Sequence, residues 1–193
     1  MFLVRILLII LFLFIARSVS SQVDSSFLKF RVADFNLQKV QDDQIKMDNR
    51  SSLFVFLSPE CPLCKGYMKL FDSIYNQYKE HVNIYGVFPG KAYSTSDIQS
   101  FASEYSVHIP LYIDSAMSLT HYLNAAVTPE AVLLNDKNEL VYKGAIDNLL
   151  EGLGKRKIKA TAFYLQDALE QSLNNKTVVI KSIKAVGCKI NEY

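Results

Sequence analysis

The feature that most limits how this sequence can fold is a pair of cysteines between a strand pattern and a helix pattern. Leu53 to Leu57 is a continuous apolar run, typical of a strand buried on both faces. The chain then reads Cys61-Pro62-Leu63-Cys64, and from Pro62 to Lys79 the apolar residues follow a helical spacing. Proline suits the first turn of a helix, where its missing N–H group is not needed. The pattern predicts a buried strand that leads directly into a helix, with Cys61 at the junction.

The rest of the chain alternates between strand and helix patterns. We predict strands at Phe27–Phe35, His81–Phe88, Leu111–Ile113 and Thr177–Ile180, and helices at Thr95–Tyr105, Ala116–Leu123 and Lys159–Leu173. A β-hairpin is predicted from Ala131–Leu134 and Leu140–Lys143, which flank a turn-rich segment, and a loop is predicted for the polar stretch Gln38–Arg50. This order predicts an α/β protein with a mixed central sheet and helices on both faces.

The N-terminus has the order of a secretory signal peptide, which we assign to residues 1–21. Arg5 is followed by the apolar run Ile6–Ala16 and then by small polar residues. The run is shorter than the ~20 residues of a membrane-spanning helix. We therefore expect an exported protein, periplasmic or otherwise extracytoplasmic after cleavage. The alternative is an uncleaved segment that anchors the chain to the membrane or associates with it transiently. Residues 22–176 are predicted to form one domain, and residues 177–193 a C-terminal extension.

Charge and cysteine count narrow the possible partners. Loss of the signal removes Arg5 and Arg17, which leaves 19 basic and 19 acidic residues. A neutral domain does not indicate a nucleic-acid partner. Three cysteines are present, and an exported domain normally pairs its cysteines. With an odd number, at least one is free or pairs elsewhere.

The placement of the two close cysteines favours redox chemistry. A helix N-terminus stabilises a thiolate, and in such pairs it lowers the cysteine pKa to somewhere in the range ~3.5–7.5. Cys61 is then the candidate nucleophile, and Cys64, one turn later, would resolve its mixed disulfides. Leu63 lies between them and is a candidate substrate contact, whereas the charge of Glu60 would oppose thiolate formation.

Metal binding is the alternative interpretation of these two cysteines. A zinc site needs further ligands, and the sequence has no second C-x-x-C pair. His81, His108 and His121 are scattered along the chain. We therefore expect neither a metal nor another cofactor.

Three segments carry a resemblance to a known superfamily: Phe54–Cys64, Val127–Glu130 and Val141–Gly144. Over residues 27–173 the chain resembles the thioredoxin superfamily, in its exported branch of redoxin and AhpC/TSA-like domains. The resemblance implies a thioredoxin-like mixed sheet with a central insertion at Tyr93–Leu123. It also implies a cis Pro129 that faces the active cysteines, with Thr128 and Pro129 binding an extended substrate.

Several positions depart from that family pattern. Glu60 stands where a tryptophan is usual, and Val55 stands where thioredoxins carry a buried acid. Glu130 is the candidate proton acceptor in its place. The chain ends in a Gly-Cys-x-Ile sequence similar to that of some exported members. Its Cys188 is a third redox thiol, a thiol for partner docking, or a small buried residue.

Three functions are compatible with these residues. The resemblance implies a thiol–disulfide oxidoreductase that acts on protein thiols and disulfides and exchanges electrons with a redox partner protein. A peroxiredoxin-like peroxidase would oxidise Cys61 with peroxide and resolve it with Cys64. Ser58 suits that reaction, but Phe54 stands where peroxiredoxins carry proline, and no arginine lies within Val127–Glu130. The third function is a non-enzymatic partner-binding module that senses redox state.

Overall fold

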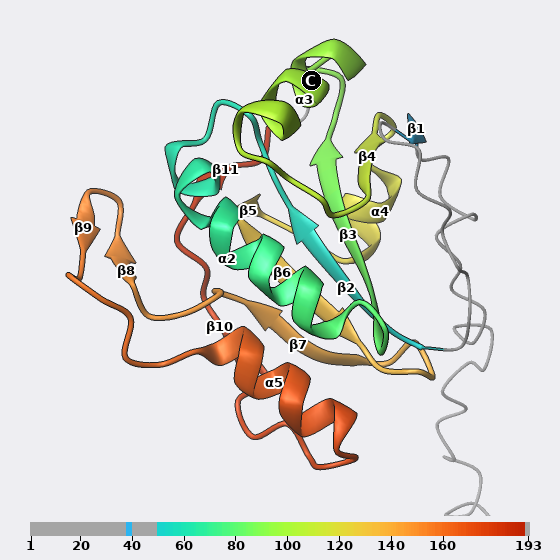
Figure 1. Ribbon diagram of the computed structural model, residues 1–193, viewed down its shortest axis with the longest axis vertical. Helices are drawn as coiled ribbons and strands as arrows, with labels where there is room; N and C mark the ends of the chain where they lie inside the picture. The colour runs from blue at the N-terminus through green and yellow to red at the C-terminus, as the bar shows by residue number, and fades with distance from the viewer. Residues whose placement is uncertain (1–37, 40–49, 192–193) are drawn as a thin grey trace, which may run out of the picture.

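A computed structural model describes residues 38–39 and 50–191, and Figure 1 shows how their helices and strands are arranged. In chain order the elements are β1 (Gln38–Lys39), β2 (Ser51–Phe56), α2 (Pro62–Tyr78), β3 (Val82–Pro89), α3 (Thr95–Glu104), β4 (Leu111–Asp114), α4 (Ser118–Tyr122), β5 (Val127–Thr128), β6 (Glu130–Leu134), β7 (Leu140–Gly144), β8 (Leu150–Gly152), β9 (Lys155–Arg156), α5 (Tyr164–Leu173), β10 (Ser182–Ile183) and β11 (Cys188–Lys189).

The central sheet has the strand order β1-β4-β3-β2-β6-β7-β10. β2 pairs in parallel with β3 and antiparallel with β6, so it lies in the middle of the sheet. β4 is parallel to β3, and β7 is antiparallel to β6. The sheet is therefore mixed, as the sequence predicts. Two short pairs, β5 with β11 and β8 with β9, lie outside it.

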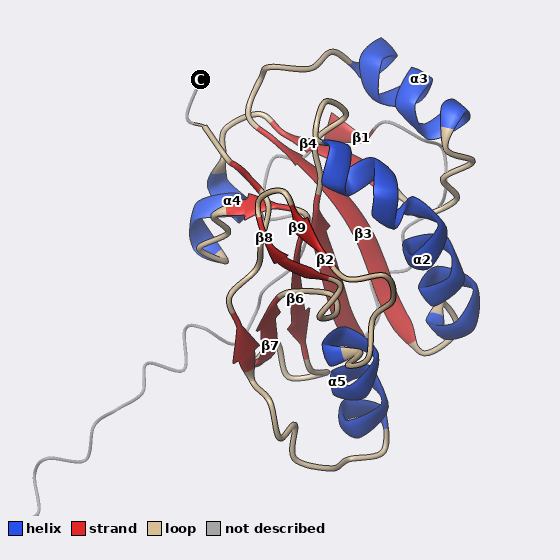
Figure 2. Cartoon of the chain, turned by 90° about the vertical axis from the view of Figure 1, so that its left-hand side faces the viewer, coloured by secondary structure: helices blue, strands red, loops and turns tan. Residues whose placement is uncertain are grey.

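Helices cover both faces of the sheet, because the central strand carries apolar side chains on both faces. Figure 2 shows α2, α3 and α5 on one side and α4 on the other. Leu53 and Val55 of β2 pack toward the three-helix side, in the larger of two core clusters. Phe54 and Phe56 alternate with them and pack into the smaller cluster, on the side of α4. This alternation explains why the run reads as continuously apolar.

Most elements lie where the sequence predicts them, with shifts at several ends. The helix expected to begin at Lys159 begins at Tyr164, because the N–H groups of Thr161 and Ala162 donate to the Asn148 side chain in a turn. The helix α3 begins at Thr95, as expected, and Ser94 caps it by forming a reciprocal capping box with Asp97.

Two expectations about strands are wrong. The last strand of the sheet is not Thr177–Ile180 but β10, which pairs in parallel with β7. The polar stretch expected to be a loop contains β1, which pairs with β4. Neither two-residue strand is long enough to show a periodic pattern.

Residues 177–193 are predicted from the sequence to be a C-terminal extension. In the structure, the described part of this segment, residues 177–191, supplies β10 and β11. One strand joins the central sheet, and the other pairs with β5. The expected strand Phe27–Phe35 and the expected signal peptide lie outside the described residues. Within the described part of the chain, no helix is both long and apolar enough to cross a membrane.

Candidate active site

Cys61 lies at the junction of β2 and α2, as the sequence predicts. It is the N-cap residue of the helix, with an extended backbone, and Pro62 follows it in the first turn. The Cys61 carbonyl accepts the first helical hydrogen bond, from the Lys65 N–H group. The positive end of the α2 dipole is therefore directed toward this residue.

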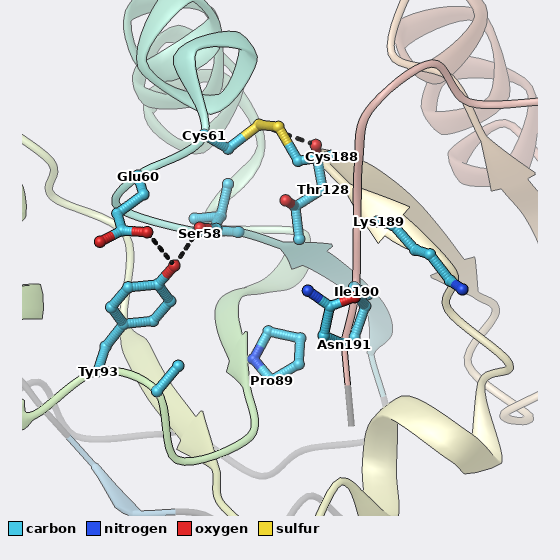
Figure 3. A pocket seen from close by; sticks show the side chains of 12 residues that line it. Ser58, Glu60, Cys61, Pro89, Tyr93, Thr128, Cys188, Lys189, Ile190 and Asn191 are labelled. Atoms are coloured by element: carbon cyan, nitrogen blue, oxygen red, sulfur yellow. Dashed lines mark hydrogen bonds between the residues drawn. A yellow bond between two sulfur atoms is a disulfide. The ribbon is translucent and has the colours of Figure 1, made fainter. Parts of the chain in front are cut away.

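Cys61 is bonded to Cys188 rather than to Cys64. The two residues are 127 positions apart in the chain, and their Cα atoms are 6.1 Å apart. The sequence analysis pairs Cys61 with Cys64 in the exchange reaction, whereas this structure holds Cys61 in a disulfide with Cys188 and leaves Cys64 as a free thiol. A sequence pattern favours the nearer cysteine, but here tertiary folding brings the C-terminal segment over the helix N-terminus (Figure 3).

Cys64 is a free, fully buried thiol one turn into α2. Burial raises its pKa to about 11, and hydrogen bonds from the Ser58 amide and the Thr128 side chain only partly oppose this effect. The Ser58 N–H group lies 3.4 Å from the Cys64 sulfur. At neutral pH the residue is therefore a protonated thiol, held beneath the disulfide.

The segment before β6 faces the disulfide. The Thr128–Pro129 peptide bond is cis, which confirms that prediction. Thr128 is buried, and its carbonyl oxygen lies 3.1 Å from the Cys61 sulfur. A sulfur in a disulfide carries no proton, so this is a contact in the oxidised form. A Cys61 thiol in the same place would donate a hydrogen bond to that oxygen.

A pocket of about 300 Å³ opens beside the disulfide, and Figure 3 shows the residues that line it. The Tyr93 hydroxyl is 3.0 Å from the Ser58 hydroxyl and donates to the exposed Glu60 carboxylate at 3.4 Å. The carboxylate of Glu60 is thus held toward Tyr93 at the mouth of the pocket. Tyr93 has no motif around it, and sequence reasoning missed it.

The other candidate residues have structural contacts as well. Leu63 is half-buried and packs against the larger core cluster. Glu130 is buried, and its carboxylate accepts a hydrogen bond at 2.8 Å from the Ala126 N–H group. That bond braces the turn before β5, whereas the sequence suggested Glu130 as a proton acceptor for the cysteines.

A buried polar pair ties α2 to the loop after β7. The Tyr67 hydroxyl donates to the Asp147 carboxylate at 2.5 Å, and the same oxygen accepts from the Leu149 N–H group at 2.8 Å. Tyr67 lies one turn after Cys64, so this pair fixes the helix that carries both cysteines. Within residues 38–39 and 50–191, no group of three or more His, Cys, Asp or Glu side chains is placed to hold a metal ion.

Comparison with known protein families identifies the family of this chain. The model of the AhpC/TSA family matches residues 25–143, more than half of the chain. The chain belongs to the AhpC/TSA family. The matched region contains Cys61, Cys64 and Pro129, and Cys188 lies beyond its end. A comparison with curated proteins found no match.

Solved structures share the thioredoxin-like fold of this AhpC/TSA family member. A hypothetical protein from Sinorhizobium meliloti has 22% identity and a TM-score of 0.67, covering 76% of this chain and 81% of its own. An uncharacterized conserved protein from Geobacillus kaustophilus has 20% identity and a TM-score of 0.69, covering 82% and 88%. The dsbF protein of MTB, solved in mixed oxidized and reduced forms, has 14% identity and a TM-score of 0.52, covering 78% and 96%. These likenesses concern the fold.

Proposed function

We propose that this protein is a thiol–disulfide oxidoreductase that acts on protein disulfides, with Cys61 as the exchanging cysteine. The observation that carries the proposal is the disulfide on Cys61 at the N-terminus of α2, against the Thr128 carbonyl. A cysteine at a helix N-terminus is activated as a thiolate. Its bond to a distant part of the chain supports its ability to form disulfides with an extended segment.

The proposed reaction has two exchange steps. The Cys61 thiolate attacks one sulfur of a substrate disulfide, which forms a mixed disulfide and releases the other substrate sulfur as a thiolate. The Cys64 thiolate then attacks the Cys61 sulfur, so that the second substrate thiolate leaves and a Cys61–Cys64 disulfide remains. The substrate gains two electrons and the cysteine pair loses two. The reverse sequence oxidises a substrate dithiol.

Thr128, Pro129 and Leu63 are proposed to contact the substrate. The Thr128 carbonyl oxygen lies 3.1 Å from the Cys61 sulfur, Pro129 follows Thr128 across a cis peptide bond, and Leu63 lies between the cysteines in sequence. The natural partners would be protein thiols and disulfides together with a redox partner protein. A location outside the cytoplasm, where disulfides persist, belongs to the same proposal and is supported by the signal-like N-terminus.

Two assays on the same preparation test this function. We expect the protein to accelerate reduction of insulin by dithiothreitol and to consume hydrogen peroxide no faster than Cys61→Ser. Peroxide consumption that depends on Cys61, with no effect on insulin, would indicate the peroxidase instead. Activity in neither assay would favour the partner-binding module.

A further inference from the structure

The C-terminal segment occupies the place where an extended substrate would bind. β11 pairs antiparallel with β5, with Cys188 opposite Thr128 and Lys189 opposite Val127. One residue further, the Ile190 N–H group donates to the Ala126 carbonyl at 3.0 Å. These are the main-chain contacts by which a peptide adds to an exposed strand, and they do not depend on the identity of the bound side chains.

Two side-chain positions of the segment are constrained. A Cβ atom on Gly187 would lie 2.5 Å from the Thr128 carbonyl oxygen and 3.0 Å from the Val127 Cβ atom. Only glycine therefore fits immediately before the bonded cysteine. Ile190, two residues after Cys188, is partly buried against the smaller core cluster. Lys189 between them is exposed, so its position is free to vary.

We propose that residues 187–190 are a tethered substrate of this site, and that external substrates are extended segments of the form Gly-Cys-x-apolar that replace it on β5. The inference rests on the function proposed above and names its substrate class. An external strand can form the same main-chain hydrogen bonds as β11, and its cysteine would meet Cys61 where Cys188 does. The strand must also satisfy the same two constraints, because they come from Thr128, Val127 and the core rather than from the tether.

Release of the tethered strand needs no external oxidant. The Cys64 thiolate attacks the sulfur of Cys61, a Cys61–Cys64 bond forms, and the Cys61–Cys188 bond breaks. Cys188 leaves as a thiolate, so Cys64 is oxidised and Cys188 is reduced. β11 is then held on β5 only by noncovalent contacts. A substrate thiolate that takes its place attacks Cys61 and frees Cys64.

The first arm of the test measures this internal exchange. In oxidised protein the ratio of the Cys61–Cys188 to the Cys61–Cys64 disulfide does not depend on the redox buffer, because both states contain one disulfide and one thiol. In Gly187→Ala the new methyl group collides with Thr128, and we expect the ratio to fall about tenfold. The matched control is Gly152→Ala, whose Cβ atom meets nothing within 4 Å. Its ratio should equal that of the wild type.

The second arm tests external strands on a full chain in which Cys61 is the single thiol, Cys64→Ser/Cys188→Ser. The probes are a peptide with the sequence of residues 184–191, supplied as its mixed disulfide with glutathione, and the same peptide with alanine in place of the glycine. Cys61 attacks the peptide sulfur, glutathione leaves as a thiolate, and the adduct is measured by mass spectrometry. We expect the glycine peptide to form its adduct about tenfold faster, since the same methyl clash opposes its rival.

The outcomes separate the two proposals. A lower ratio in Gly187→Ala together with a faster glycine peptide supports the tethered substrate. Equal rates for the two peptides, or a wild-type ratio in a folded Gly187→Ala, would overturn it while leaving insulin reduction intact. A protein whose free Cys61 exchanges with neither insulin nor either peptide would overturn the proposed function itself, and the substrate class with it.

Discussion

The sulfur of Cys61 lies 3.1 Å from the carbonyl oxygen of Thr128, the residue opposite Cys188 in the β5–β11 pair. The disulfide to Cys61 and the pairing of β11 with β5 therefore both hold Cys188 in place. Neither is independent of the other, because separating β11 from β5 pulls on the bond to Cys61. Substitution of the cysteines, changes of pH and substitutions of residues packed in the same domain should each have a measurable effect.

Removing Cys188 should change which disulfide forms. Oxidised wild-type protein should yield a Cys61–Cys188 peptide pair after non-reducing digestion and mass spectrometry. In Cys188→Ser we expect Cys61–Cys64 instead, because Cys64 lies on the next turn of the same helix and meets no competitor. Two free thiols in oxidised Cys188→Ser would show that Cys64 cannot reach Cys61.

Single substitutions should separate the roles of the first two cysteines. We expect Cys61→Ser to lower insulin reduction to the uncatalysed background, because it removes the nucleophile at the helix N-terminus. Cys64→Ser should keep the first attack but accumulate mixed disulfides, visible as added mass under non-reducing conditions. If Cys64→Ser loses the attack and Cys61→Ser retains it, the roles are reversed.

Release of Cys188 by Cys64 should depend strongly on pH. Burial raises the pKa of Cys64 to about 11, so its thiolate fraction grows tenfold with each pH unit well below that value. We expect the first-order rate of release to rise about tenfold per unit between pH 6 and pH 9. Acid quenching, alkylation and mass spectrometry would follow the thiol of Cys188.

Cys64→Ser is the control for this profile and should show no release at any pH. A wild-type rate that becomes constant above pH 8 would contradict the expected pKa, since it would mean that Cys64 is already ionised there.

Two glycines in the same domain should respond oppositely to alanine. A Cβ atom on Gly86 in β3 would lie 2.5 Å from a methyl carbon of the fully buried Leu111, so Gly86→Ala should lower the free energy of unfolding by ~1–3 kcal/mol. Gly66 lies on α2 with nothing within 4 Å of the added atom. Gly66→Ala should raise the free energy of unfolding by ~0.5–1 kcal/mol through helix propensity. Urea unfolding measures both, and equal effects would refute the packing argument.

The buried pair beneath the cysteines should contribute to stability. Tyr67→Phe leaves the Asp147 carboxylate without its hydroxyl donor, and we expect a loss of ~1–3 kcal/mol in the free energy of unfolding. Asp147→Asn is the matched control, because its amide oxygen can still accept from Tyr67 and Leu149. A loss in Asp147→Asn at least as large as in Tyr67→Phe would show that the charge of Asp147 matters more than this hydrogen bond.

The same pair has a defined pH dependence. Burial, followed by the adjacent Asp147 carboxylate, raises the pKa of Tyr67 far above its ordinary value. In the folded state the hydroxyl thus stays protonated at a pH where the unfolded chain ionises. This contribution to stability is complete below pH ~10, the ordinary tyrosine pKa, and is lost as the pH rises beyond it. The stability difference between wild type and Tyr67→Phe should therefore shrink above pH ~10.

Local pattern was enough to predict the elements at the centre of the sheet, including the strand and the helix that place Cys61. The run Leu53–Leu57 and the helical spacing after Pro62 correspond to β2 and α2, and the hairpin corresponds to β6 and β7. Those elements are long, and their periodicity reports which face is buried. The position of Cys61 at the junction follows directly from them.

The partner of Cys61 was decided only by the tertiary structure. β5 and β11 have two residues each, too few for any period, and the residues they bring together are about sixty positions apart in sequence. Spacing along the chain therefore favoured Cys64 as the partner, whereas the close approach of Gly187 to Thr128 brings Cys188 to Cys61. Contacts between distant short segments depend on how the whole sheet places them, because no local free-energy preference specifies them.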